Sequence, residues 1–157
     1  MNSDRDSVLI IGYNNPLHSN DSTGPCVARE LRRRGFHAIE VQQLTPELAE
    51  TIAGFEVVVF VDADVTAPPG EVRTVALTAQ GAEVPLAGES SPGPLEHSLS
   101  PSGLLSLAAA LYGKTPRASL LGIGCESFEL GDRLSIAARR GVHAAITMCL
   151  GAGYNGL

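Results

Sequence analysis

Three continuous runs of aliphatic residues constrain the fold of this chain more than any other feature of its sequence. They are Val8–Gly12, Val57–Asp62 and Ser119–Gly124. A strand that is covered on both faces loses the alternation of apolar and polar residues, so each run predicts a buried parallel strand. Two runs that alternate more, Ala38–Gln42 and Val72–Thr78, predict strands nearer the edges of the same sheet.

Helical segments with start and stop signals separate these runs. The expected helices run from Thr23 to Gly35, from Thr45 to Gly54, from Ser100 to Gly113 and over about 134–150. This alternation predicts an α/β fold, a three-layer α/β/α sandwich with a mostly parallel sheet of roughly five strands. The length fits a single domain, residues 1–157. Residues 80–99 are rich in Gly, Pro, Ser and Glu, which predicts a mobile loop with a functional role or a tolerated insertion.

Composition and charge argue against several classes of function. The net charge is −6, and the only basic run, 32–34, falls in the expected last turn of a helix, where cations oppose the helix dipole. Nucleic-acid binding would need a broader basic face. No apolar stretch approaches the ~20 residues of a membrane span, and the polar N-terminus does not resemble a signal peptide. We therefore expect a cytoplasmic protein, a monomer with no nucleic-acid or membrane partner.

The cysteines and the short motifs exclude further chemistries. Cys26, Cys125 and Cys149 are far apart and show no CxxC spacing, which indicates reduced thiols. The GKT at 113–115 lacks the earlier glycine of a phosphate-binding loop and follows an expected helix instead of a strand. The sequence GYN at 12–14 breaks the dinucleotide fingerprint, and neither GxSxG nor HExxH occurs.

Polar side chains follow every buried strand, at the edge where parallel α/β sheets bind ligands. They are Asn14, Asn15 and Asp21 after the first strand, Asp62 and Asp64 at the second, Glu126 and Ser127 after the third, and His97 before the third helix. Two carboxylates and a histidine suit a divalent transition metal. Because Asp62 ends an all-apolar strand, where an unpaired charge is costly, a functional role is favoured there over a turn cap.

These residues also have ordinary structural interpretations. Asp21 fits the positive end of the following helix, Asp64 fits a solvated turn, and His97 alone would be an ordinary loop histidine. The other histidines are weaker candidates: His18 in the first loop, and His37 and His143 as surface or structural residues.

Four segments, taken together and in order over about residues 7–150, resemble the hydrogenase maturation proteases. The family's first loop typically reads G-x-G-N-x-L-x-x-D-(D/E)-x-x-G, and GYNNPLHSNDSTG at 12–24 matches it at Gly12, Asn15, Leu17, Asp21 and Gly24. The other three segments are VDA at 61–63, HSLSPSGLLSLAAALYG at 97–113 and LLGIGCESFELGDRLS at 120–135.

The resemblance implies an endopeptidase that removes the C-terminal extension of a nickel-loaded hydrogenase large-subunit precursor. By motif, the family's metal-contacting and catalytic residues fall on Asp21, Asp62 and His97. The nickel is implied to come with the precursor and not to stay on the free protein. A cation can polarise the scissile carbonyl or acidify a bound water, and a carboxylate can serve as general base.

Two departures from the family pattern leave alternatives open. Asn14 replaces a glycine of the first loop, although Asn tolerates a positive φ better than most residues. Asn20 replaces an acidic residue directly before Asp21 and removes one negative charge. The chain could therefore be a non-catalytic relative that binds or inspects the nickel-loaded subunit. A small-molecule α/β enzyme is the third interpretation.

Overall fold

The computed structural model describes residues 6–13, 23–64, 66–79, 81–82, 99–124 and 136–151. In chain order its elements are β1 (Val8–Tyr13), α2 (Thr23–Arg33), β2 (His37–Val41), α3 (Leu48–Ala53), β3 (Val57–Asp64), β4 (Val72–Thr78), β5 (Gly81–Ala82), α4 (Pro101–Tyr112), β6 (Arg117–Gly124) and α5 (Ile136–Gly151). Every strand expected from the sequence is present. The loop expected over 80–99 lies outside the described residues except for β5 and Leu99.

The strands form one sheet in the order β2-β1-β3-β6-β4-β5. Strands β2, β1, β3 and β6 are parallel neighbours, whereas β4 runs antiparallel to β6 and the two-residue β5 runs antiparallel to β4. The connection between β3 and β4 is too short for a parallel crossover, which takes about a dozen residues. The predicted α/β sandwich with a mostly parallel sheet is confirmed.

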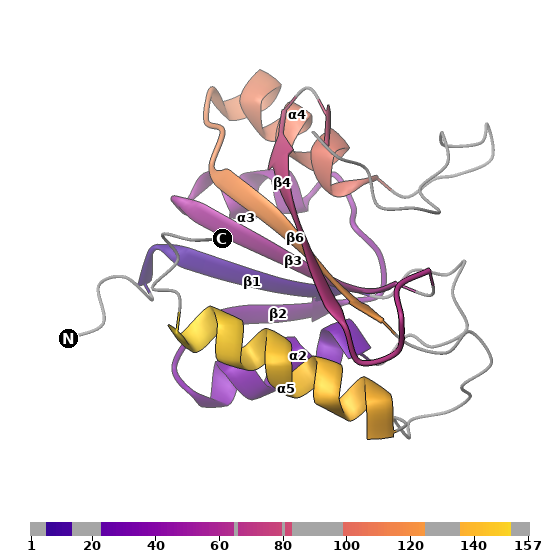
Figure 1. Cartoon of the computed structure of the whole chain (residues 1–157). Coiled ribbons are helices and arrows are strands. Elements are labelled where there is room, and N and C mark those ends of the chain that lie inside the picture. The colour runs from indigo at the N-terminus through magenta and orange to yellow at the C-terminus, as the bar shows by residue number, and fades with distance from the viewer. Residues whose placement is uncertain are drawn as a thin grey trace.

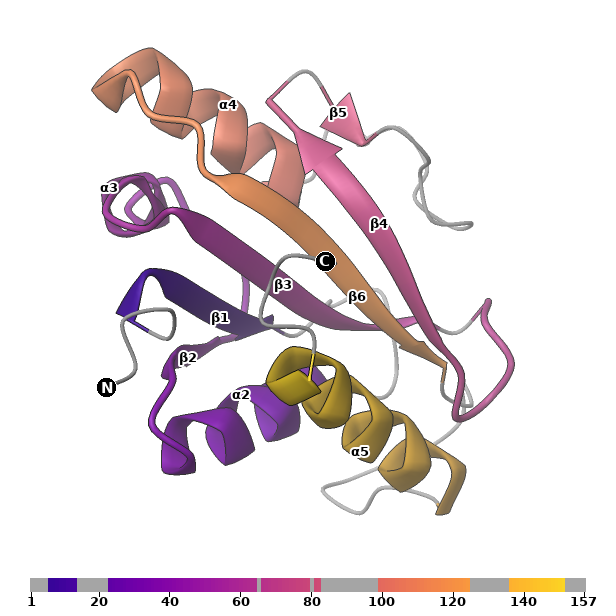
Figure 2. The ribbon, with the colours of Figure 1, turned by 60° about the vertical axis from the view of Figure 1, so that its left-hand side comes forward.

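Helices cover both faces of the sheet, α2 and α5 on one side and α3 and α4 on the other (Figures 1 and 2). Each face has its own apolar core. The core under α2 and α5 includes Val8, Ile10, Val59, Val61, Leu121 and Ile123. The core under α3 and α4 includes Leu9, Ile11, Val58, Phe60, Leu104 and Leu120. Burial on both faces is the physical reason that the central strands are apolar runs without alternation.

The helix termini follow the sequence signals with two exceptions, the starts of α2 and α3. The helix expected from Thr45 begins at Leu48, after Glu47 at its N-cap position. Ser100 caps α4, because its Oγ accepts a hydrogen bond from the Gly103 amide at 3.0 Å, and Gly113 ends the helix at a φ of 66°. This is the chemistry expected of an N-cap serine and a left-handed glycine. Thr23, predicted to cap the first helix, is instead its first residue. Its Oγ1 is buried and makes no hydrogen bond to any described residue.

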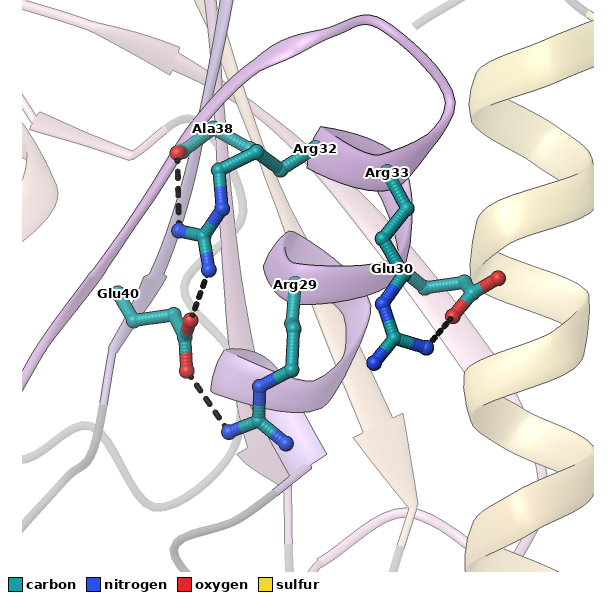
Figure 3. A network of polar contacts seen from close by, with 6 residues as sticks. All are labelled: Arg29, Glu30, Arg32, Arg33, Ala38 and Glu40. Carbon is teal, nitrogen blue, oxygen red and sulfur yellow. Dashed lines mark hydrogen bonds and ion pairs between the residues drawn. The ribbon is translucent and has the colours of Figure 1, made fainter.

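The basic run 32–34 has the structural role that its position in a helix predicts. Arg29 and Arg32 of α2 both bind the Glu40 carboxylate of β2, at 2.9 and 2.8 Å (Figure 3). The hydrogen bond from Arg29, helped by the one from Arg32, lowers the pKa of Glu40 below its usual range. Arg33, the last residue of α2, and Arg34, directly after it, pair with Glu30 of the same helix. Arg29 and Arg32 therefore join α2 to the neighbouring strand.

Among the helices of the described ranges, none is long and apolar enough to cross a membrane.

Candidate active site at the carboxyl edge of the sheet

Asp62 lies near the carboxyl end of the central strand β3 and is 7% exposed. Side chains alternate between the two faces of a strand, so Asp62 follows Val58 and Phe60 on the face that packs against α3 and α4. Its Oδ1 accepts a hydrogen bond from the Ala63 amide at 2.8 Å. This burial distinguishes Asp62 from a solvated turn residue. The functional role that the sequence favours for it stays a prediction.

Asp64 is also buried, at 3% exposure, so its interpretation as a solvated turn residue was wrong. The strand runs two residues further than expected, and Asp64 pairs with Gly124 inside the sheet. Its Oδ1 accepts hydrogen bonds from the amide and the hydroxyl of Thr66, at 3.0 and 2.6 Å. Its Oδ2 is buried and has no hydrogen-bond partner in the described part of the chain.

Arg73 of β4 lies on the same face of the sheet as Asp62. Gly122 of β6 is in register with Asp62 on one side and with Arg73 on the other. Residues in register project to the same face of a sheet. Asp62 and Arg73 are therefore on one face, two strands apart, and Gly122 on the strand between them has no side chain. Arg73 is partly exposed and pairs with Glu71 at 3.8 Å. Arg73 carries no signal in the sequence, because only the antiparallel pairing of β4 with β6 brings it beside the site.

The first turn of α2 is pressed against the carboxyl ends of β1 and β3. A Cβ on Gly12 would lie 2.1 Å from the Gly24 carbonyl oxygen, and a Cβ on Gly24 would lie 2.4 Å from the Val61 carbonyl oxygen. Only glycine allows this approach, which explains two matches in the first-loop motif. The positive end of the α2 dipole is thereby held beside the strand end that carries Asp62.

Asp62 is the only member of the predicted metal-contacting set within the described residues. Asp21 and His97 lie outside them, as do Asn14, Asn15, Asn20, Glu126 and Ser127. Within the described ranges, no three His, Cys, Asp or Glu side chains are grouped so that they could hold a metal ion. The set of two carboxylates and one histidine therefore stays a prediction.

The described cysteines are poorly reactive thiols, and the described histidines are surface residues, as the sequence indicates. Burial raises the pKa of Cys26, and it raises the pKa of Cys149 to about 12, so neither thiol is prone to ionise. His37 and His143 are both exposed, and His37 lies 3.6 Å from Asp6. None of these residues lies in the buried edge around Asp62 and Asp64. Cys125 is outside the described residues.

Comparison with known proteins is informative at the level of structure. No protein-family model matches the sequence, and no curated protein matches it significantly.

Solved structures match over nearly the whole chain. A NiFe hydrogenase maturation protease, HybD from Thermococcus kodakarensis, is 24% identical over 93% of this chain and 98% of its own, with a TM-score of 0.66. The hydrogenase maturating endopeptidase HybD from E. coli is 22% identical over 92% and 90%, with a TM-score of 0.70. The endopeptidase HycI from Escherichia coli is 18% identical over 96% and 93%, with a TM-score of 0.66. The chain therefore has the fold of the hydrogenase maturation proteases, which confirms at the level of structure the resemblance that its motifs indicate.

Proposed function

We propose that this chain is a hydrogenase maturation endopeptidase. It removes a C-terminal extension from the precursor of a hydrogenase large subunit that already carries nickel. The observation that carries the proposal is a buried carboxylate, Asp62, at the carboxyl edge of a sheet whose fold is that of maturation proteases. The order of the four sequence motifs along this fold supports the same conclusion.

The connections of the chain support the inclusion of Asp21 in the site. Two peptide bonds join Asp21 to Thr23, which limits their Cα separation to about 7.6 Å. The next residue, Gly24, lies against the Val61 carbonyl, and Val61 directly precedes Asp62. This short tether supports the proposed inclusion of Asp21 in a site with Asp62.

A short tether to Leu99 supports the proposed inclusion of His97 in the same site. Two peptide bonds join His97 to Leu99, whose amide donates a hydrogen bond to the Leu44 carbonyl at 3.3 Å. Leu99 packs on the core under α3 and α4, the face to which Asp62 belongs. Both tethers favour a site made of Asp21, Asp62 and His97.

In this proposal nickel belongs to the substrate, held by the precursor, and the three residues recognise it with oxygen and nitrogen ligands. The reaction is the hydrolysis of one peptide bond. The oxygen of a water adds to the scissile carbonyl carbon, the C–N bond breaks, and the proton passes to the departing amine. A carboxylate of the site accepts the proton of the attacking water and returns it to the leaving group. Cleavage that requires nickel would keep the unloaded precursor intact.

Substitution of the three residues tests the assignment. Asp21→Asn, Asp62→Asn and His97→Ala should each reduce the rate of precursor cleavage at least about 100-fold, the scale expected for loss of an acid–base group. Circular dichroism and the melting temperature should show that the variants fold. The matched control is His143→Ala on the exposed face of α5, which should cleave at the wild-type rate. Wild-type rates in all three site variants would show that the site is assigned wrongly.

The non-catalytic relative is suggested by the two departures from the family pattern, Asn14 and Asn20, of which Asn20 replaces an acidic residue directly before Asp21. It predicts a stable complex with the nickel-loaded precursor and no cleavage. Asn20→Asp separates the two functions, since it restores the charge of the family pattern. Cleavage that appears only in this variant would support the binding relative. Equal cleavage by both forms would show that the endopeptidase tolerates Asn20.

A further inference from the structure

The proposed reaction does not use Asp64, whose buried Oδ2 has no hydrogen-bond partner among the described residues. Asp64 is 3% exposed, and the amide and hydroxyl of Thr66 both donate to its Oδ1. These two bonds fix the orientation of the carboxylate. They leave Oδ2 buried and without a donor from the described residues.

Such an arrangement is costly for the free protein. A buried acceptor without a donor loses its hydration and gains nothing in return, and the loss is larger for a charged group. Asp62, two residues earlier on the same face, adds a second carboxylate nearby. A position of this kind is expected where function, and not stability, requires the side chain.

We infer that Asp64 is a substrate-positioning residue: its Oδ2 accepts a hydrogen bond from a donor group of the bound precursor. This inference rests on the proposed function, because it takes the partner to be the polypeptide that Asp62 helps to cleave. The donor is an N–H of the precursor, either of its backbone or of a cationic side chain near the scissile bond. Both sources share one chemistry, since an N–H⋯carboxylate bond is among the stronger hydrogen bonds in proteins.

The position of Asp64 suits a residue that holds the precursor and does not take part in the cleavage itself. Asp62 and Asp64 share one face of β3, and successive same-face residues are about 6.6 Å apart along a strand. That spacing is about the length of two residues of an extended peptide. A precursor segment lying along this edge can therefore be held at Asp64 while its scissile bond is at Asp62.

The first experiment needs no substrate. Asp64→Asn keeps the acceptor that Thr66 requires and replaces the charged Oδ2 by a neutral amide. If Oδ2 has no partner in the free protein, the melting temperature of Asp64→Asn should stay equal to that of the wild type or rise by about 2–4 °C. A fall of several degrees would show that Oδ2 has a structural donor within the fold, and would overturn the inference.

The second experiment measures the affinity and the cleavage of the nickel-loaded precursor separately. Asp64→Asn should weaken binding about 10- to 100-fold, and KM should rise in parallel while kcat changes less than about threefold, as expected for loss of a contact present before and during reaction. The matched control is Glu56→Gln, which removes an exposed carboxylate directly before β3, at the opposite end of the strand from Asp64. The control should bind and cleave the precursor like the wild type.

The outcomes separate this inference from the proposed function. A wild-type protein that binds the precursor without cutting it would refute the endopeptidase, while weaker binding by Asp64→Asn would still support the contact. Equal binding by Asp64→Asn and wild type, or an equal defect in Glu56→Gln, would overturn the contact even if cleavage is efficient. The donor is identified with precursors in which basic residues are replaced by neutral ones. If Asp64→Asn no longer weakens binding of such a precursor, the donor is the replaced side chain. If Asp64→Asn weakens binding as before, the donor is a backbone N–H.

Discussion

Gly12 of β1 and Gly24 of α2 lie backbone against backbone, so close that a Cβ on Gly12 would be 2.1 Å from the Gly24 carbonyl oxygen. The same Cβ would be 2.9 Å from the Cβ of Ala28, one turn further along the helix. The contact fixes where α2 begins relative to the ends of β1 and β3. The segment that contains Asp21 joins these two glycines, so its two ends are held by this packing.

Gly12→Ala should destabilise the protein by about 1–3 kcal/mol, because the new methyl group can be accommodated only if the first turn of α2 shifts. Urea unfolding followed by circular dichroism measures the change in the free energy of unfolding. The matched control is Gly54→Ala after α3, where a Cβ would be 3.4 Å from its nearest neighbour at a negative φ. The control should change stability by less than about 0.5 kcal/mol. Equal losses in the two variants would contradict the role given to the glycine contact.

The sheet could be predicted from sequence because the composition of its central strands is compatible with few arrangements. Runs such as Val57–Val61 have no polar side, so they must be covered on both faces, and helices between them impose parallel order. The direction of β4 was not predicted, since it depends on the short connection that follows Asp64. The burial of Asp64 was not predicted either, because it depends on the pairing of Asp64 with Gly124, which extends the strand by two residues. The strand propensity of the residues themselves does not show this pairing.

The candidate site was only partly readable in the sequence. Asp62 was found because a charge after five apolar residues is unusual, and that signal is local. Arg73 carries no local signal, because its place beside Asp62 arises from the register of β4 on β6 across Gly122. Side chains gathered by strand pairing over long distances in the sequence are visible only in the folded structure.

Glu40→Gln should lower the free energy of unfolding by about 0.5–1 kcal/mol at pH 7, since it weakens the bonds from Arg29 and Arg32 that join β2 to α2. These bonds lower the pKa of Glu40 in the folded state. Their contribution is therefore complete above the unfolded-state pKa of about 4.3 and is lost as pH falls through the folded-state value. The measurement is the difference between variant and wild type in urea unfolding, at neutral pH and at an acidic pH below the folded-state pKa of Glu40.

The difference should shrink toward zero at the acidic pH. Added salt should also reduce it at pH 7, because the arginines are about half exposed. The exposed Glu56→Gln, outside the network, is the control and should show neither effect. A difference that is constant from neutral to acidic pH would mean that Glu40 stabilises the fold without its charge.

Cys149 should resist alkylation in the native protein. It is fully buried on α5, and its pKa of about 12 leaves a thiolate fraction of about 10⁻⁴ at pH 8. Cys26 on α2 is partly exposed and has a raised pKa, so it should react more slowly than a free thiol but faster than Cys149. Peptide mass spectrometry after iodoacetamide treatment measures both rates. Protein unfolded in guanidinium chloride is the control, in which both cysteines should react alike. Native labelling of Cys149 at the unfolded rate would contradict its place in the core.

The proposed endopeptidase activity is tested most directly by mixing the purified protein with a hydrogenase large-subunit precursor and following the mass of the precursor. Two forms of the precursor are compared, one loaded with nickel and one free of it, with Asp62→Asn as the inactive control. A nickel-dependent endopeptidase should cause a discrete loss of mass from the C-terminus of the loaded form, none from the nickel-free form, and none with the variant. An intact loaded precursor, or equal cleavage by wild type and Asp62→Asn, would show that the proposed function or its site is wrong.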